Sequence, residues 1–426
     1  MKKKNEAFEN IIGYENEKKL LKRVIDVLNH QDKYKKIGST IPHGLFIYGP
    51  PGLGKSTISQ ELLNQVNNRK AYIIRKIKSD GEFINYMSDI FALAKKNQPS
   101  IILLDDLDKF AELSEDKGNN EEFVAVQSFI DDIKNDDIFI VATANNKNCL
   151  PNSLLRAGRF DIKLKIDYPK EKDSVEIFKH YLKNKKIDKS VNVQNVSYIL
   201  GSASCADLEK VCNQASIYAG FMNKNAIGMD ELLRAALEFS YDTNIEDDES
   251  EDKYALNTAY HEAGHAVVAE MLEPGSISFI TTLKTDSLTK GLTKYWQNDY
   301  YWQDIDFMIN RLTALLGGRA ATEIIYHKCD VGATLDLERA YNIADRLVDN
   351  YCLMDFCSWV QRPNDSSEKV KCSRDNNINQ LIAKYYHQAK EIIIANQDKL
   401  DTLAHLLCDK KIVFQDEIQN IMKNGC

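Results

Sequence analysis

Short apolar runs alternate with amphipathic stretches in the first part of this chain. Residues 44–48, 101–104 and 138–143 are apolar runs with the length of buried strands, and apolar positions recur at helical spacing between them. Residues 8–36 also show helical spacing, among many charges. Strands that alternate with helices predict a parallel sheet covered on both faces over residues 44–166.

The rest of the chain is patterned mainly as helices. From about residue 170 to 240, apolar positions recur at helical spacing without strand alternation, which predicts a small helical subdomain. An acidic run follows, of the kind that forms solvated linkers. Beyond it the pattern is again helical, with strand-like pieces at 277–280 and 291–295. We expect an α/β domain at 1–167, the helical subdomain at 168–242, the linker at 243–252 and a mainly helical domain at 253–426.

Composition narrows the classes of function. The 426 residues are 43% hydrophobic and 28% charged, as in ordinary globular proteins, and the net charge of −8 gives no basic surface for a nucleic-acid partner. No segment approaches the roughly 18 consecutive apolar residues of a transmembrane helix. The basic start, residues 1–4, lacks the apolar stretch of a signal peptide. Nine cysteines without a C-x-x-C pair indicate free thiols, as in a reducing compartment. From these features together we expect a cytoplasmic protein with no transmembrane segment in this chain.

A phosphate-binding loop joins the first predicted strand to a helix. Strand, glycine-rich loop and helix follow one another in the order that this motif requires. The alternative, a glycine-rich turn without function, would not require a strand before it and a helix after it. The glycines let backbone N–H groups approach phosphate oxygens. Lys55 can reach the β- and γ-phosphates, and the Ser56 hydroxyl can bind Mg²⁺. The loop residues are Gly49, Pro50, Pro51, Gly52, Leu53, Gly54, Lys55, Ser56 and Thr57.

Two acidic residues, Asp105 and Asp106, end the second predicted strand. In phosphate-loop NTPases an acid at this point holds the Mg²⁺ shell, and a neighbouring acid orients the attacking water. We assign Asp105 to the first role and Asp106 to the second.

Two histidines four residues apart mark the second half of the chain. His261 and His265 lie on one helical face, with Cβ atoms about 5–6 Å apart, close enough to share a metal. Glu262 stands beside the first histidine, where it can polarise a metal-bound water. This is the H-E-x-x-H pattern of zinc metallopeptidases. A pair of core histidines is the alternative, but unpaired buried imidazoles are costly.

Taken together, these motifs resemble the FtsH family of AAA+ ATP-dependent zinc metalloproteases. The similarity runs from about residue 8 to the C-terminus, with both halves in the family's order. It implies an α/β P-loop AAA+ domain with a parallel sheet, a small helical lid subdomain and a mainly α zinc peptidase domain. The supporting stretches are Pro50-Pro51, Asp105-Asp106 and residues 154–161 in the ATPase half, and residues 259–267, 316–321 and 332–337 in the peptidase half.

The resemblance implies roles for further residues of the ATPase half, whose cofactors are ATP and Mg²⁺. Asn145 falls at the sensor position, where an amide contacts the γ-phosphate or its attacking water. Arg156 and Arg159 match paired arginine fingers that reach a neighbouring subunit's nucleotide, and such a finger is worth about 10³–10⁵ in rate. The family forms hexamers, so we expect a homo-hexamer.

The resemblance also implies a third zinc ligand. A catalytic zinc usually has three protein ligands and a water, and Asp336 occupies the place of the family's aspartate ligand. Glu323 is our second choice, with Asp330 and Glu338 behind it. In the implied mechanism on protein or peptide substrates, Glu262 takes a proton from the zinc-bound water and delivers it to the leaving amine. His327 and His387 are expected to be ordinary helix or surface histidines.

Three departures from the family concern the coupling of ATP to proteolysis. Asp106 stands where the family has glutamate, and a carboxylate misplaced by about 1 Å can cost about 10²-fold in rate. The pore loop, Lys78-Ser79-Asp80-Gly81, has Ser79 in place of the family's aromatic residue, and Phe83 is the substitute if the loop is shifted. The family's N-terminal membrane anchor has no counterpart in these 426 residues, so we expect either a trimmed chain or a soluble relative, and the start at residues 1–4 favours the latter.

Our main hypothesis is a hexameric, ATP-dependent zinc endopeptidase that degrades unfolded or flexible proteins. The first alternative is a zinc peptidase whose AAA+ ring mainly assembles and gates it, with little ATP-driven threading. The second is a non-proteolytic remodelling ATPase.

Overall fold

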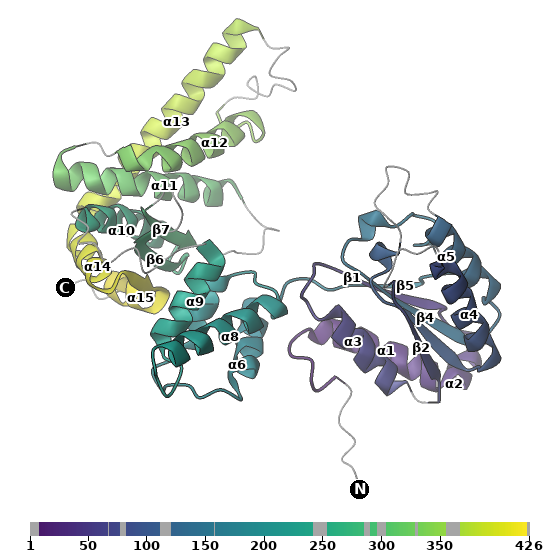
Figure 1. The fold of residues 1–426 in the computed structure, drawn as a ribbon. Coiled ribbons are helices and arrows are strands. Elements are labelled where there is room, and N and C mark those ends of the chain that lie inside the picture. The colour runs from purple at the N-terminus through teal and green to yellow at the C-terminus, as the bar shows by residue number, and fades with distance from the viewer. Residues whose placement is uncertain are drawn as a thin grey trace. The chain divides into compact units, whose positions relative to one another are not determined.

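The chain folds as two compact units in the computed structural model (Figure 1). The first unit comprises Met1–Lys189 with Ser202–Ile227, and the second comprises Ser190–Gly201 with Gly228–Cys426. The structure describes residues 8–66, 68–76, 82–110, 121–156, 158–241, 254–284, 290–295, 304–328, 331–354 and 367–423.

A five-stranded parallel sheet forms the centre of the first unit, in the order β2-β3-β4-β1-β5. Every residue of β3 and β4 is buried, as expected for inner strands covered on both faces, so the predicted parallel sheet is confirmed. The apolar runs predict the three inner strands but not β2 and β5, which lie at the edges and leave most side chains partly exposed. The strands are β1 (Gly44–Tyr48), β2 (Lys70–Ile74), β3 (Ser100–Leu104), β4 (Ile138–Ala144) and β5 (Ile162–Lys165).

Alternate side chains of the inner strands enter two separate cores. Ile101 and Leu103 of β3 pack into the core that includes α1 and α3, whereas Ile102 and Leu104 pack into the core that includes α4 and α5. This alternation follows from the two-residue period of a strand. Figure 1 shows these helix pairs on opposite faces of the sheet. The helices are α1 (Glu15–Asn29), α2 (Gln31–Lys35), α3 (Lys55–Gln65), α4 (Phe83–Lys96) and α5 (Glu121–Asp132), with short 3₁₀ turns η1 (Leu107–Lys109) and η2 (Lys147–Cys149).

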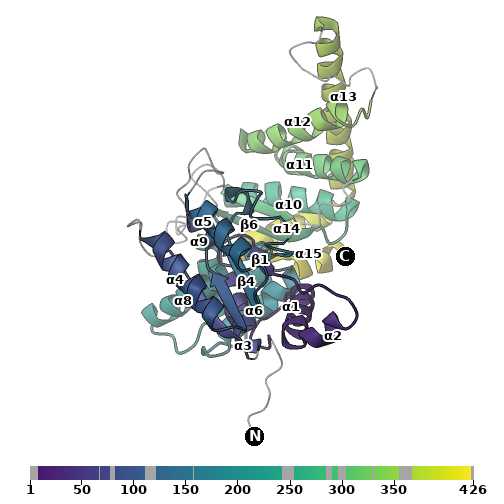
Figure 2. The same ribbon diagram turned by 90° about the vertical axis from the view of Figure 1, so that its right-hand side faces the viewer.

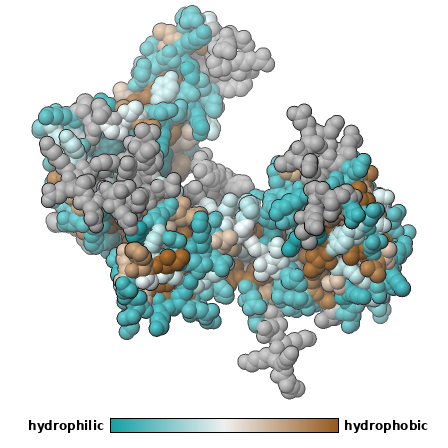
Figure 3. Space-filling model, in the orientation of Figure 1, coloured by the Kyte–Doolittle hydropathy of each residue, from teal (hydrophilic) through white to brown (hydrophobic). Residues whose placement is uncertain are grey.

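The surface of the first unit carries hydrophobic side chains near the edge strand β2. Figure 3 shows brown atoms over the region of β2 and α4. Ile73, Tyr86 and Leu93 are exposed hydrophobic residues of these two elements, and the Tyr86 hydroxyl donates a hydrogen bond to the Ile73 carbonyl.

The expected lid region is helical. Its helices pack in two pairs, α6 with α8 in the first unit and α7 with α9 in the second. The expected linker at 243–252 lies outside the described residues, and the domain boundaries stay predictions. The four helices are α6 (Glu171–Leu182), α7 (Val193–Leu200), α8 (Cys205–Phe221) and α9 (Met229–Tyr241).

The second unit is built around helix α10 (Ala255–Leu272). All residues from 259 to 270 of this helix are buried, as expected for a helix enclosed on every side. Figures 1 and 2 both show α11 between α10 and α12. A three-stranded antiparallel sheet, in the order β7-β6-β8, also packs against α10. The other elements are β6 (Ile277–Lys284), β7 (Lys290–Tyr295), α11 (Ile305–Tyr326), η5 (Val331–Ala333), α12 (Thr334–Asp349), α13 (Glu368–Ala395), α14 (Gln397–Lys410), β8 (Ile412–Phe414) and α15 (Gln415–Lys423).

Within the described ranges, none of the helices combines the length and the apolar character that crossing a bilayer requires.

Candidate functional site

Three side chains of the second unit converge on one point. His261 and His265 lie on α10, and Asp336 lies in the first turn of α12. The Nε2 atoms of the two histidines are 3.1 Å apart, and Asp336 Oδ2 lies 3.1 Å from His261 Nε2 and 3.2 Å from His265 Nε2. The structure thus brings together the three residues expected to bind zinc.

These three atoms fit a metal ion. Tetrahedral zinc with bonds of about 2.0–2.1 Å separates its ligand atoms by about 3.3 Å, close to the spacing of this group. His265 Nδ1 donates a hydrogen bond to the Ala314 carbonyl at 2.8 Å, so Nε2 becomes the metal-binding atom once its own proton is lost. Burial raises the pKa of Asp336, but the charge of His265 and hydrogen bonds from both histidines outweigh it and hold this pKa well below its usual range. Asp336 is therefore a carboxylate, the form that binds metals.

Glycines let two helices approach closely enough to build this group. A Cβ atom at Gly318 of α11 would lie 2.5 Å from His265 Nε2 and 2.8 Å from His261 Nε2. A Cβ at Gly264 of α10 would lie 2.6 Å from the Gly317 carbonyl oxygen. Residues 316–321 carry the family resemblance, but the resemblance does not predict this steric role. Two adjacent glycines inside a helical pattern were the available signal, because glycine otherwise weakens a helix.

Glu262 is held by strand β7. Its carboxylate is buried, and Oε2 accepts a hydrogen bond from the Thr293 hydroxyl at 2.6 Å. A Cβ at Gly291 would lie 2.6 Å from Glu262 Oε1, so the strand passes directly over the carboxylate. Burial raises the pKa of Glu262, while His261, His265 and the Thr293 bond oppose this shift. A carboxylate with a raised pKa beside a metal site is suited to accept and return a proton. Sequence reasoning missed Thr293, which lies outside the local motif.

The alternative third ligands lie elsewhere. Glu323 accepts hydrogen bonds from Tyr386 and from Lys390, the latter at 2.7 Å, so this carboxylate is engaged with α13. Glu338 is exposed, and Asp330 lies outside the described residues. Our second choice for the third ligand is therefore wrong, since among the described residues only His261, His265 and Asp336 form such a group. His327 and His387 are exposed, as expected.

The phosphate-binding loop of the first unit surrounds Lys55. The Lys55 ammonium donates hydrogen bonds to the Gly49 carbonyl at 2.8 Å, the Pro50 carbonyl at 2.7 Å and Asn145 Oδ1 at 2.8 Å. The structure thus brings the expected lysine and the expected sensor amide together. Gly52 and Gly54 have φ of 77° and 81°, a region that favours glycine and lets the loop turn its amides inward. This cradle at the start of α3 fits a nucleotide phosphate.

The two acidic residues after β3 lie beside this loop. Asp105 Oδ1 lies 3.5 Å from the Ser56 hydroxyl and accepts a hydrogen bond from the Thr143 hydroxyl at 2.7 Å. Asp106 has a left-handed backbone with φ of 56°, its N–H donates to the Thr143 hydroxyl, and its carboxylate pairs with Lys109 at 2.7 Å. A hydroxyl and a buried carboxylate at this distance fit a hydrated Mg²⁺. Sequence reasoning missed Thr143, which links both acids.

The two candidate arginine fingers have different surroundings. Arg159 donates to both carboxylate oxygens of Asp131, at 3.1 and 2.7 Å, and also bonds Gln127 and the Ser153 carbonyl. Arg156 is exposed, and no hydrogen bond joins its side chain to another described residue. Asp161, two residues after Arg159, accepts backbone hydrogen bonds from Gly158 and His43, both at 2.7 Å, and so fixes the segment that carries the arginines.

The pore loop at 78–81 lies outside the described residues. Phe83, its proposed substitute, is 7% exposed and packs edge-on against Phe110 in the core. This side chain therefore does not present an aromatic surface to a substrate, and the shifted-loop alternative is wrong.

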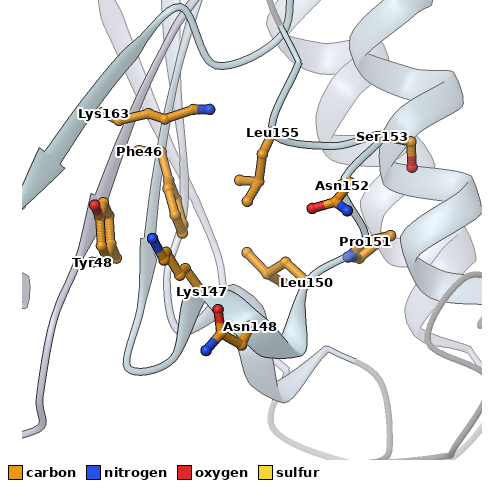
Figure 4. Close-up of a pocket in the computed structure, with 10 residues that line it drawn as sticks. All are labelled: Phe46, Tyr48, Lys147, Asn148, Leu150, Pro151, Asn152, Ser153, Leu155 and Lys163. Atoms are coloured by element: carbon orange, nitrogen blue, oxygen red, sulfur yellow. The ribbon is translucent and has the colours of Figure 1, made fainter. Parts of the chain in front are cut away.

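A cavity of about 770 Å³ lies beside the strands of the first unit (Figure 4). Phe46 and Tyr48 of β1 face Leu150 and Leu155 across it, and the Lys147 ammonium lies 5.4 Å from the centre of the Tyr48 ring. None of the residues assigned to nucleotide binding lines this cavity. Its lining is Phe46, Tyr48, Lys147, Asn148, Leu150, Pro151, Asn152, Ser153, Leu155 and Lys163.

Comparison with known proteins matches two parts of the chain to two families. Residues 249–421 match peptidase family M41, and residues 45–168 match the ATPase family associated with various cellular activities (AAA). The chain is 29% identical over 99% of its length to the ATP-dependent zinc metalloprotease FtsH 2 of Thermoanaerobacter sp. (strain X514), covering 83% of that protein. It is 27% identical to the ATP-dependent zinc metalloprotease FtsH of Caldicellulosiruptor bescii and 26% identical to that of Bacillus subtilis (strain 168), in each case over 99% of this chain and 72% and 71% of the relative.

Proposed function

We propose that the chain, as a member of the FtsH family of AAA+ zinc metalloproteases, degrades unfolded or flexible proteins as a homo-hexameric ring in the cytoplasm. It is a zinc metalloendopeptidase coupled to an AAA ATPase, and its cofactors are zinc and ATP with Mg²⁺. The observation that carries the proposal is the convergence of His261, His265 and Asp336 beside Glu262.

In the peptidase unit, His261, His265 and Asp336 would hold the zinc, which would supply a Lewis acid for the scissile carbonyl and for the attacking water. Glu262 is placed to accept a proton and to deliver it to the leaving amine, as a carboxylate with a raised pKa can do. Thr293 fixes the orientation of Glu262 through its hydroxyl. Strand β7 lies at an edge of its sheet, where backbone pairing can hold an extended substrate.

In the ATPase unit, Lys55 and the loop amides bind the phosphates, and Ser56 and Asp105 hold the Mg²⁺ shell. Asp106 and Asn145 orient the attacking water. Arg156 contacts the nucleotide of a neighbouring subunit, a role supported by its exposure, whereas the internal bonds of Arg159 support a structural role.

The first test separates threading from gating. Two features favour gating: Asp106 stands where the family resemblance implies glutamate, and Phe83 is buried. Degradation of a casein-type substrate is measured with ATP, with a non-hydrolysable analogue and without nucleotide. Threading predicts degradation with ATP alone, and equal cleavage with the analogue would support the gating ring instead.

The second test separates a peptidase from a remodelling ATPase. Glu262→Gln is expected to lower degradation by about 10²–10⁴-fold while zinc content stays at the wild-type level, because the amide cannot accept the proton. ATP turnover of the same variant serves as the internal control. Undiminished degradation in this variant would revive the non-proteolytic alternative.

A further inference from the structure

Arg75 is bonded to the carboxylate of Asp105, the residue that we expect to bind Mg²⁺. Arg75 is the first residue after β2, and Asp105 is the first residue after β3. Because Ile74 pairs with Leu104 in the parallel ladder, the two residues leave neighbouring strands side by side. Arg75 Nε donates to Asp105 Oδ2 at 3.1 Å, and Nη2 bonds the same oxygen.

The pair is asymmetric in burial. The Asp105 side chain is 2% exposed, whereas that of Arg75 is 59% exposed. A buried carboxylate needs a compensating cation, and removing it is costly. A long side chain that is mostly in water can leave the carboxylate without disturbing the core. Hence Asp105 is the fixed partner and Arg75 the movable one.

Mg²⁺ and Arg75 require the same carboxylate. Asp105 Oδ1 is already bonded to the Thr143 hydroxyl, and Oδ2 carries the guanidinium. Mg²⁺ demands a near-ideal octahedral shell of oxygen atoms, and a guanidinium on this carboxylate occupies part of that space with donors that bring no lone pair. The Ser56 hydroxyl faces Oδ1 whereas Arg75 is bonded to Oδ2, so the two cations compete for the negative charge of one carboxylate, and Arg75 weakens Mg²⁺ binding there.

We propose that Arg75 is a tethered competitor of Mg²⁺ at Asp105, which raises the Mg²⁺ concentration needed to load the nucleotide site. This inference rests on the proposed role of Asp105 in nucleotide binding. Arg75 holds the carboxylate until Mg²⁺ enters with the nucleotide and then moves into solvent. The magnesium requirement of the ATPase is in this way set by a side chain outside the phosphate-binding loop.

The test compares the full-length protein with Arg75→Met, and with Arg23→Met, which makes the same change at an exposed position of α1. Binding of a fluorescent ADP analogue is titrated with Mg²⁺, and again in EDTA. Arg75→Met is expected to reach half-saturation at a Mg²⁺ concentration about three- to tenfold lower, because a charge-assisted bond to Asp105 is lost. Arg23→Met is expected to match the wild type.

Two results overturn the inference. One is an unchanged or higher Mg²⁺ requirement in Arg75→Met. The other is weaker nucleotide binding by this variant in EDTA, which means that Arg75 contacts the phosphates themselves. If the variant fails to fold, Arg75→Lys serves instead, since it keeps the charge but loses the two-nitrogen contact and is expected to lower the requirement less. A wild-type protein that binds no nucleotide at any Mg²⁺ concentration overturns the ATPase assignment as well.

Discussion

The three proposed zinc ligands can lie together only because glycines, which have no Cβ atom, leave room between α10 and α11. Gly318 faces both imidazoles, and Gly264 and Gly317 bring the backbones of α10 and α11 into contact. The same approach places the Ala314 carbonyl beside His265 and fixes that ring. The ligand geometry is therefore a property of the helix crossing as well as of the ligands.

Gly318→Ala is expected to lower zinc affinity by at least about tenfold, because the added methyl would lie 2.5 Å from His265 Nε2 and push the ring from its place. Zinc content after dialysis against a weak chelator measures this. Gly220→Ala on α8 is the matched control, since its Cβ meets no atom within 4 Å. Equal zinc retention in both variants would contradict the steric argument.

Asp106 has a left-handed backbone, which aspartate adopts more readily than glutamate does. Asp106→Glu is expected to raise ATP turnover by about 10²-fold, because the longer side chain restores the residue that the family resemblance implies at this position. A slight loss of thermal stability should accompany it, owing to the backbone conformation. Turnover is measured at saturating Mg²⁺, and an unchanged rate would mean that the backbone already compensates for the shorter side chain.

Residues whose chemistry lies within one turn or one loop could be predicted from the sequence. His261, His265 and Lys55 are examples, because spacing alone defines their relation. Asp336 came from resemblance, since 75 residues separate it from His261. Thr293 and Arg75 act through contacts between separate strands and helices, which no local pattern encodes.

Secondary-structure elements differ in how plainly their sequences mark them. The inner strands β1, β3 and β4 are continuous apolar runs and could be predicted. The edge strands β2 and β5 could not be predicted in this way, because part of each strand is exposed to solvent and carries polar residues. Helix α10 is enclosed on all sides, so its burial could not be read from an apolar stripe. Strand β7 lies at a sheet edge and yet covers the buried carboxylate of Glu262.

The position of β7 predicts the effect of Thr293→Val. This variant keeps the shape of the side chain but loses the hydroxyl that bonds Glu262 Oε2 at 2.6 Å. We expect kcat for a short peptide to fall about tenfold, with zinc content and KM unchanged, because Glu262 loses its orientation. Thr293→Ser should restore most of the activity. A fully active valine variant would show that the hydroxyl does not position the base.

The whole chain pairs a nucleotide-binding unit with a peptidase unit. Domain boundaries placed by composition treat the helices between 168 and 242 as one block, but the structure assigns α6 and α8 to one unit and α7 and α9 to the other. A pattern that is followed along the chain cannot reveal this interleaving, because it depends on which helices pack together.

Subunit mixing tests the proposed ring. Arg156→Ala is expected to lower ATP turnover about 10³-fold without loss of thermal stability, since an exposed finger acts on a neighbouring subunit. Arg159→Ala should instead lower the unfolding temperature, because four partners lose their bonds: both oxygens of Asp131, Gln127 and Ser153. Mixing Arg156→Ala with Lys55→Ala protein should restore part of the turnover. If the mixture of the two variants turns over ATP no faster than the sum of the separate variants, Arg156 does not act between subunits.

The zinc ligands also have a mechanical consequence. They join the middle of α10 to the first turn of α12, across 71 to 75 residues of sequence. An ion bound there closes that long loop and stabilises only the folded chain, by about 4 kcal/mol at a thousandfold excess over its dissociation constant. Chelation should therefore lower the unfolding temperature of the peptidase unit and expose α12 to proteolysis, while the ATPase unit melts as before. A bound ion would therefore add to the stability of the peptidase unit as well as to its chemistry, so zinc depletion is expected to increase the unfolded fraction of the protein while it lowers activity.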